Sequence, residues 1–140
     1  MATAVSIPQP GCTRRTAIAA AAIALVGGDA HAADDASPSE PERRWLDAAA
    51  SQKDRAGSWG DQPYGAVLVL DGVLVGEGPS RVVKNRDPHA HAEREAIKDA
   101  QRRLGRTSLT GAVLYSTSRP CALCAAAAAQ AGIGRMVYPA

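Results

Sequence analysis

Four side chains in the second half of the chain are suited to metal-assisted chemistry. His91 and the pair Cys121 and Cys124 offer one imidazole and two thiols, a set that favours a tetrahedral zinc ion. Because three protein ligands leave the fourth position open, the pattern is typical of a catalytic zinc site and not of a structural one. Glu93 follows His91 by two residues, where a carboxylate can take a proton from an activated water and pass it to a substrate nitrogen.

Two predicted helix starts have to bring these side chains together. Asp87 is a favourable N-cap and Pro88 suits the first position of a helix. That helix would carry His91 and Glu93 in its first turn. Pro120 opens a second predicted helix in the same way, directly before the Cys-x-x-Cys pair. Because a helix amino terminus lowers the pKa of a nearby thiol, we expect both thiols to ionise easily.

Hydrophobic periodicity predicts alternating helices and strands around these motifs. In chain order we expect a helix over 42–57, strands over 64–70 and 73–77, a helix over 90–104, a strand over 111–116, an alanine-rich helix and a strand over 135–138. Asp71-Gly72 between the first two strands is a strong signal for a tight hairpin. The apolar face predicted for the helix over 90–104 contains Ala92, Ala96, Ile97, Ala100 and Leu104. The length allows one such α/β domain.

The chemistry-bearing residues resemble the zinc-dependent cytidine/deoxycytidylate deaminase superfamily. His-x-Glu at 91–93 followed by Pro-Cys-x-x-Cys at 120–124 is the signature of those deaminases. Further similarity at 63–67, 114–115 and 134–138 occurs in family order and is greatest to the branch of guanine deaminases and tRNA-specific adenosine deaminases. The resemblance implies a three-layer α/β/α sandwich around a mixed sheet, with four visible strands where relatives have five.

The resemblance also implies an activity and a set of roles. The expected reaction is hydrolytic deamination of a nucleobase or nucleoside of guanine, adenine or cytosine type, with release of ammonia. The imidazole and two thiols would hold Zn²⁺, and Glu93 would transfer the proton. The backbone N–H of Ala92 would help to hold the base, with Ser80 and Tyr64 as further residues of the substrate pocket.

Four features depart from the family pattern. Ser80 stands where relatives usually have an Asn that contacts the base, and one hydroxyl cannot reproduce a two-ended amide contact. Arg119 replaces an acidic neighbour of the thiols and so changes the charge offered to a substrate. The five alanines over 125–129 bury little area each, which predicts a thin core where relatives build a dimer contact. Relatives continue beyond the position of Ala140 with a helix and often a strand, and a homodimer that covers this gap stays open.

The first third of the chain predicts export. Arg14 and Arg15 precede an apolar run that ends at Val26, and Ala30-His31-Ala32 offers a small-x-small cleavage site. The apolar run falls short of the ~20 residues that cross a membrane. We therefore expect a twin-arginine-type signal peptide over 1–32, a polar linker over 33–41, a zinc deaminase domain over 42–140, a periplasmic location and no membrane association after cleavage.

The overall charge says little about a polyanionic partner. The whole chain has 16 basic and 14 acidic residues and a formal net charge of +2. Cleavage of the signal removes Arg14, Arg15 and Asp29, which leaves a nearly neutral domain. Near-neutrality gives no support for broad contact with a phosphate backbone. Charge and export together favour a small-molecule base or nucleoside as the substrate and argue against a nucleic acid.

Two other classes of protein stay open. A periplasmic thiol-disulfide protein would use Cys121 and Cys124 without His91, and it predicts a redox-active pair and no stoichiometric zinc. A catalytically inactive zinc-binding domain of the deaminase fold would explain Ser80 and the alanine run together. That class predicts full zinc occupancy with no turnover on any base.

Overall fold

The computed structural model of the chain describes residues 37–140. The predicted signal peptide over 1–32 and the first four residues of the predicted linker over 33–41 lie outside the described residues, whereas Glu40 and Pro41 at the end of that linker lie in a helix. The elements in chain order are α1 (Glu40–Ser58), β1 (Gly65–Leu70), β2 (Val73–Pro79), α2 (Ala92–Leu104), β3 (Val113–Ser116), α3 (Ala122–Gln130) and β4 (Arg135–Val137). All seven correspond to elements expected from the sequence, with bounds that differ by a few residues.

The four strands form one mixed sheet in the order β2-β1-β3-β4. β1 pairs antiparallel with both β2 and β3, whereas β3 and β4 run parallel. Asp71 and Gly72 join β1 to β2 with φ angles of 51° and 73°. Two consecutive positive φ angles are the geometry of the type I′ hairpin turn, so the predicted hairpin is confirmed.

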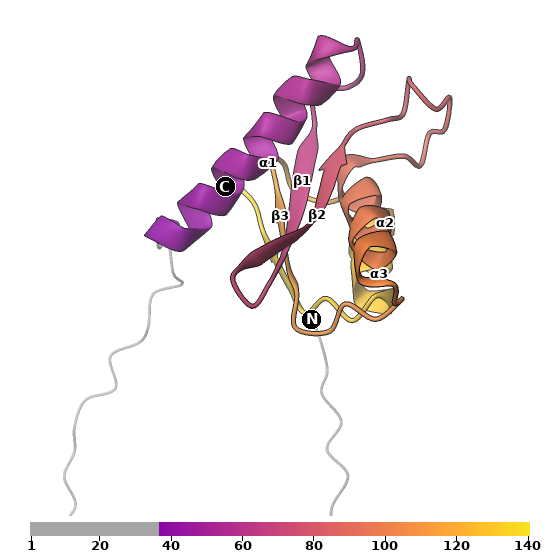
Figure 1. Ribbon diagram of the computed structural model, residues 1–140. Coiled ribbons are helices and arrows are strands. Elements are labelled where there is room, and N and C mark those ends of the chain that lie inside the picture. Colours follow the sequence, from indigo (N-terminus) through magenta and orange to yellow (C-terminus); the bar gives the residue numbers. More distant parts are fainter. Residues whose placement is uncertain (1–36) are drawn as a thin grey trace, which may run out of the picture. The chain divides into compact units, whose positions relative to one another are not determined.

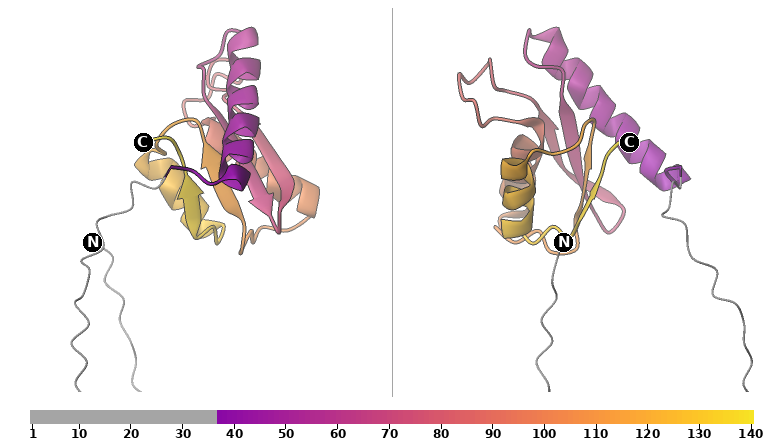
Figure 2. Two further views of the ribbon diagram at one scale, coloured as in Figure 1. Left: turned by 90° about the vertical axis from the view of Figure 1, so that its left-hand side faces the viewer. Right: turned by 180° about the vertical axis from the view of Figure 1, so that it is seen from behind.

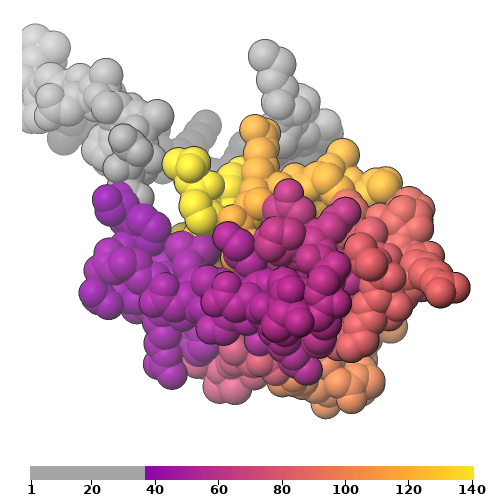
Figure 3. Space-filling view, turned by 90° about the horizontal axis from the view of Figure 1, so that it is seen from above, coloured from indigo at the N-terminus to yellow at the C-terminus, as the bar shows by residue number. Residues whose placement is uncertain are grey.

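Helices cover both faces of this sheet, as the three-layer prediction requires. α1 crosses one face, and α2 and α3 lie on the other (Figures 1 and 2). Because side chains alternate along a strand, β1 sends Ala66 and Leu68 towards α2 and Val67 and Val69 towards α1. The core on the α1 side includes Ala49 of that helix. Figure 3 shows the loop 80–91 beside the carboxyl end of α1.

Two glycines of β2 allow α2 to lie directly on the sheet. A Cβ atom at Gly78 would stand 2.0 Å from the carbonyl oxygen of Ala92, and one at Gly76 would stand 2.5 Å from that of Ala96. Both distances are far below an ordinary contact, so only glycine permits this approach. The first turn of α2 is thereby held at a fixed height above the strand.

The start of α2 differs from the sequence prediction. The helix begins at Ala92, with His91 as its N-cap residue, and not at the turn that follows Asp87. The carboxylate of Asp87 instead accepts a hydrogen bond from the backbone N–H of His89, and its carbonyl accepts one from Ala90. These two bonds close a separate turn before the helix, so the predicted N-cap role of Asp87 is wrong.

The carboxyl half of the fold follows the sequence prediction with two differences. α2 ends at Leu104 and is followed by Gly105 as its C-cap residue in a left-handed conformation. Leu104 is 36% exposed and does not join the predicted apolar face. α3 begins at Ala122, with Cys121 as its N-cap residue, so Pro120 precedes the helix and does not open it. Within α3 the buried residues are Cys124 and Ala128, as expected for a thin core. No helix within residues 37–140 has the length and apolar character needed to cross a membrane.

Candidate metal centre and pocket

The three predicted zinc ligands lie together where α2 and α3 begin. Nδ1 of His91 is 3.6 Å from Sγ of Cys121 and 3.5 Å from Sγ of Cys124. The three ligand atoms all lie within 4.8 Å of one another. Tetrahedral zinc with Zn–N of ~2.05 Å and Zn–S of ~2.3 Å requires an N···S separation of about 3.6 Å. The side chains therefore fit zinc in both donor chemistry and spacing.

The two helix starts position these ligands in equivalent ways. His91 is the N-cap residue of α2, and Cys121 is the N-cap residue of α3. Sγ of Cys121 accepts a hydrogen bond of 3.4 Å from the backbone N–H of Cys124, which holds the Cys121 thiol at the start of α3. The predicted convergence of two segments 30 residues apart in sequence is confirmed.

The two thiols differ in their readiness to ionise. The backbone N–H of Cys124 lowers the pKa of Cys121, as expected at a helix start. Burial, followed by the negative charge of Glu93, raises the pKa of Cys124 well above its usual value. The expectation of two easily ionised thiols is therefore wrong for Cys124, because burial outweighs the helix terminus there. A bound divalent cation stabilises the ionised form of both thiols and would therefore lower the pKa of Cys124.

Glu93 lies next to the ligand cluster and is held in one orientation. The residue is only 5% exposed, and its Oε1 accepts a 2.8 Å hydrogen bond from the hydroxyl of Ser116. Ser116 is the last residue of β3 and faces the same side of the sheet as Leu114. The sequence predicts Ser116 as part of a strand and indicates no role for it, although the alternation along that strand directs its side chain towards the predicted site.

A pocket opens beside the cluster and contains every residue predicted to hold the substrate. Its volume is ≈ 400 Å³, within the usual range for small-molecule sites. Its walls are formed by Gln62, Tyr64, Ser80, His91, Ala92, Glu93, Ser118, Arg119 and Cys121. Tyr64 is 46% exposed and presents an aromatic ring at the pocket. Tyr64, Ser80 and Ala92 thus line the same pocket. Their contact with a substrate stays a prediction.

Asp61 supports the pocket wall and was not identified from the sequence. The hydroxyl of Ser80 donates to Oδ1 of Asp61 at 3.0 Å. Backbone N–H groups of Gln62, Val83 and Lys84 donate to the same carboxylate at 2.8 to 3.0 Å. Burial alone would raise the pKa of Asp61, but these four hydrogen bonds together hold it below its usual value. The ionised carboxylate therefore ties Ser80 to the loop that leads into α2.

The partners of Asp61 explain why no sequence pattern points to this residue. Ser80 is 19 residues away and Lys84 is 23 residues away, so no local spacing relates them. The hydrogen bond that Ser80 donates to Asp61 uses the only proton of the Ser80 hydroxyl. That side chain consequently has no hydrogen left to donate to a ligand.

Comparison with known proteins matches the described part of the chain to a characterised family. Residues 39–140 match the family model described as the cytidine and deoxycytidylate deaminase zinc-binding region. The tRNA-specific adenosine deaminase of Aquifex aeolicus is 36% identical over 96 residues, which cover 69% of this chain and 64% of that protein. The tRNA-specific adenosine deaminase of Agrobacterium fabrum is 45% identical over 85 residues, which cover 61% and 56%.

Solved structures give the same result for the fold. The crystal structure of guanine deaminase from Bacillus subtilis superimposes with a TM-score of 0.67 and 34% identity, over 70% of this chain and 63% of that chain. The chain thus spans less than two thirds of the length of each of these relatives.

Proposed function

We propose that this chain, which belongs to the cytidine and deoxycytidylate deaminase family, is a zinc-dependent enzyme that hydrolytically deaminates a nucleobase or nucleoside and releases ammonia. The observation that carries the proposal is the arrangement of one imidazole and two thiols at zinc-ligand spacing beside a pocket that contains Glu93. The relatives named as guanine deaminase and tRNA-specific adenosine deaminase support an amino-substituted base as the substrate.

His91, Cys121 and Cys124 would hold the ion. When bound, zinc supplies a Lewis acid that makes water a nucleophile at neutral pH. His91 and Cys121 also line the pocket, so the ligand cluster forms part of the wall against which a base would rest. Cys124 is fully buried and is not among the residues that line the pocket.

Glu93 would transfer the proton in this reaction. Its carboxylate would take a proton from the attacking water and give it to a ring nitrogen, and would then take the proton of the newly added hydroxyl and give it to the leaving amine, which departs as ammonia. The hydrogen bond from Ser116 holds Oε1 and thereby limits rotation of the carboxylate. A general base must be held within hydrogen-bonding reach of the proton that it moves, which a fixed orientation favours.

The pocket residues would orient the base. Ala92 is the first residue of α2, so its backbone N–H has no carbonyl partner within the helix and is available to a ligand. Tyr64 would offer an aromatic face for stacking. Ser80 offers only acceptor capacity, because its hydroxyl already donates to Asp61. A base held here would be read mainly by the Ala92 N–H and by shape.

A screen of the purified protein tests the proposal. Metal analysis should find about one zinc per chain, and at least one member of a panel of guanine, adenine, cytosine and their nucleosides should release ammonia. Cys121→Ser should lower zinc occupancy and ammonia release together. Full zinc occupancy with no ammonia from any member of the panel would favour the catalytically inactive alternative.

A thiol-disulfide protein is the second candidate, and the cysteine pair itself favours it. Cys121 is exposed with a lowered pKa, whereas Cys124 is buried with a raised pKa. An accessible attacking thiol next to a buried one is a common arrangement in disulfide exchange. His91→Ala separates the two functions, because it should remove zinc and deamination but leave disulfide exchange unchanged.

A further inference from the structure

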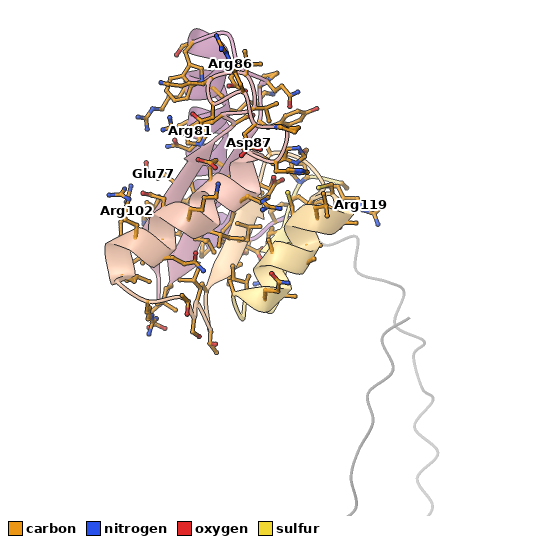
Figure 4. The ribbon with its side chains drawn as sticks, turned by 90° about the vertical axis from the view of Figure 1, so that its right-hand side faces the viewer. Glu77, Arg81, Arg86, Asp87, Arg102 and Arg119 are labelled. Atoms are coloured by element: carbon orange, nitrogen blue, oxygen red, sulfur yellow. The ribbon has the colours of Figure 1, made fainter. Side chains whose placement is uncertain are left out.

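The pocket contains one permanently cationic side chain, that of Arg119. Arg119 lies two residues before Cys121, is exposed and lines the pocket together with Gln62 and Tyr64. Figure 4 shows it at the start of α3, on a different part of the surface from Arg102 at the end of α2. A ligand that occupies this pocket therefore has a guanidinium group within its lining.

Arg119 has no ion-pair partner within residues 37–140, unlike most arginines near α2. Arg102 and Arg103 are paired with carboxylates of β2 and α2, and Arg81 is paired with Glu95. No salt bridge, side-chain hydrogen bond or cation–π contact found in the described part of the chain involves Arg119. Its five N–H donors are therefore available to a group that enters the pocket.

The surroundings of Arg119 add to its positive potential. The first turn of α3, which starts three residues later, contains no acidic residue. A helix amino terminus itself carries a partial positive charge. The carboxylate on the pocket wall is that of Glu93, which is buried and already accepts a hydrogen bond from Ser116. The pocket is thus cationic at its exposed side and acidic next to the metal ligands.

We propose that Arg119 determines substrate specificity by binding a phosphate group carried by the base-containing substrate, as in a nucleoside monophosphate. A guanidinium binds phosphate through two parallel N–H···O bonds, and a terminal monophosphate offers up to two negative charges at neutral pH. A neutral base or nucleoside gains nothing from this contact. The proposal rests on the proposed deaminase function, because the base must occupy the pocket for its phosphate to meet Arg119.

Calorimetric binding to zinc-loaded protein tests the proposal without turnover. The measurement uses a Glu93→Gln background, so that ligand is not consumed, and compares adenosine, guanosine and cytidine with their 5′-monophosphates at constant ionic strength. For the base that binds, the monophosphate should bind about tenfold more tightly, the factor that corresponds to ~1.4 kcal/mol from a charge-assisted contact. Arg119→Gln should reduce this ratio to about one, and Arg119→Lys should retain part of it.

A matched variant controls for the general effect of charge. Arg106 is also exposed but does not line the pocket, so Arg106→Gln should leave the tenfold ratio unchanged. A short single-stranded oligonucleotide that contains the same base distinguishes the source of the phosphate. If it binds more tightly than the monophosphate and loses that advantage in Arg119→Gln, the phosphate that Arg119 binds belongs to a nucleic acid chain.

The outcomes separate this inference from the function on which it rests. Equal affinity for nucleoside and monophosphate overturns the role of Arg119 but leaves deamination intact. A monophosphate preference that persists in Arg119→Gln also overturns it. Absence of binding to every nucleoside and nucleotide, together with absence of ammonia release from the unaltered enzyme, contradicts the proposed function itself.

Discussion

Replacing Gly78 by alanine should weaken the metal centre although Gly78 touches none of its ligands. The new Cβ would lie 2.0 Å from the carbonyl oxygen of Ala92 and 2.4 Å from the backbone nitrogen of Ala96, whereas ordinary contact begins at 3.4 Å. Both atoms belong to the backbone of α2, so no side chain can rotate away. The start of α2 would have to move from the sheet by roughly 1.4 Å, the difference between the shorter distance and ordinary contact.

Such a movement affects stability and metal binding together. Overpacking of this kind costs about 1–3 kcal/mol of unfolding free energy. Because His91 immediately precedes α2, the movement also displaces Nδ1 from the thiols, which lie only 3.5 and 3.6 Å away. Sites of this type tolerate displacements of about 0.5 Å. We therefore expect zinc affinity to fall at least tenfold.

Two measurements check the effect of Gly78→Ala. Urea denaturation of the metal-free proteins gives the change in unfolding free energy, and competition with a chromophoric chelator gives the change in zinc affinity. Gly57→Ala is the matched control, since Gly57 lies in α1 with no atom within 4 Å of its added Cβ, and it should be neutral or slightly stabilising. A Gly78→Ala protein with normal stability and normal zinc affinity would refute the claim that this glycine sets the height of α2.

Three further predictions concern other parts of the chain. Asp61→Asn should destabilise the protein by about 1–3 kcal/mol at neutral pH, since a carboxylate that accepts four hydrogen bonds is lost. Because the folded-state pKa of Asp61 is lowered, its contribution to the free energy of unfolding is present above its unfolded pKa of ~3.9 and is lost as pH falls towards the folded value. The free energy of unfolding should therefore depend less steeply on acidic pH in the variant. Ser116→Ala should lower kcat with little change in zinc content, and equal kcat in both proteins would show that the hydrogen bond to Glu93 does not matter. If residues 1–32 are a twin-arginine signal, the exported protein should have the mass expected for cleavage after Ala32, and lysines at 14 and 15 should block export; unchanged export would contradict that assignment.

The sequence predicts the parts of this site that depend on residues close together in the chain. The His-x-Glu and Pro-Cys-x-x-Cys motifs each place their side chains within one turn, and Asp71-Gly72 specifies its hairpin by local conformation. Even so, local reasoning was wrong for Asp87. Its carboxylate forms a hydrogen bond within its own turn, and a short-range competition of this kind is not decided by residue preference alone.

The supporting contacts depend on tertiary structure and leave no pattern in the sequence. Asp61 contacts Ser80 because β1 pairs with β2, and Ser116 contacts Glu93 because β3 packs beside the start of α2. The raised pKa of Cys124 has the same origin, because the burial that causes it is a property of the packed α2–α3 face. The pocket residues follow from the family resemblance, whereas the groups that orient them follow only from the fold.

Zinc X-ray absorption spectroscopy of the mature protein tests the central claim most directly, because it reports the atoms bound to the ion. Three protein ligands from His91, Cys121 and Cys124 predict two sulfur scatterers at ~2.3 Å and two nitrogen or oxygen scatterers at ~2.0–2.1 Å. Because His91→Ala should lose zinc during purification, that variant is measured after reconstitution with added zinc, where the light-atom shell should change and both sulfurs should remain. A shell of four sulfurs, or a natively purified protein without zinc and with Cys121 and Cys124 joined in a disulfide, would contradict the account.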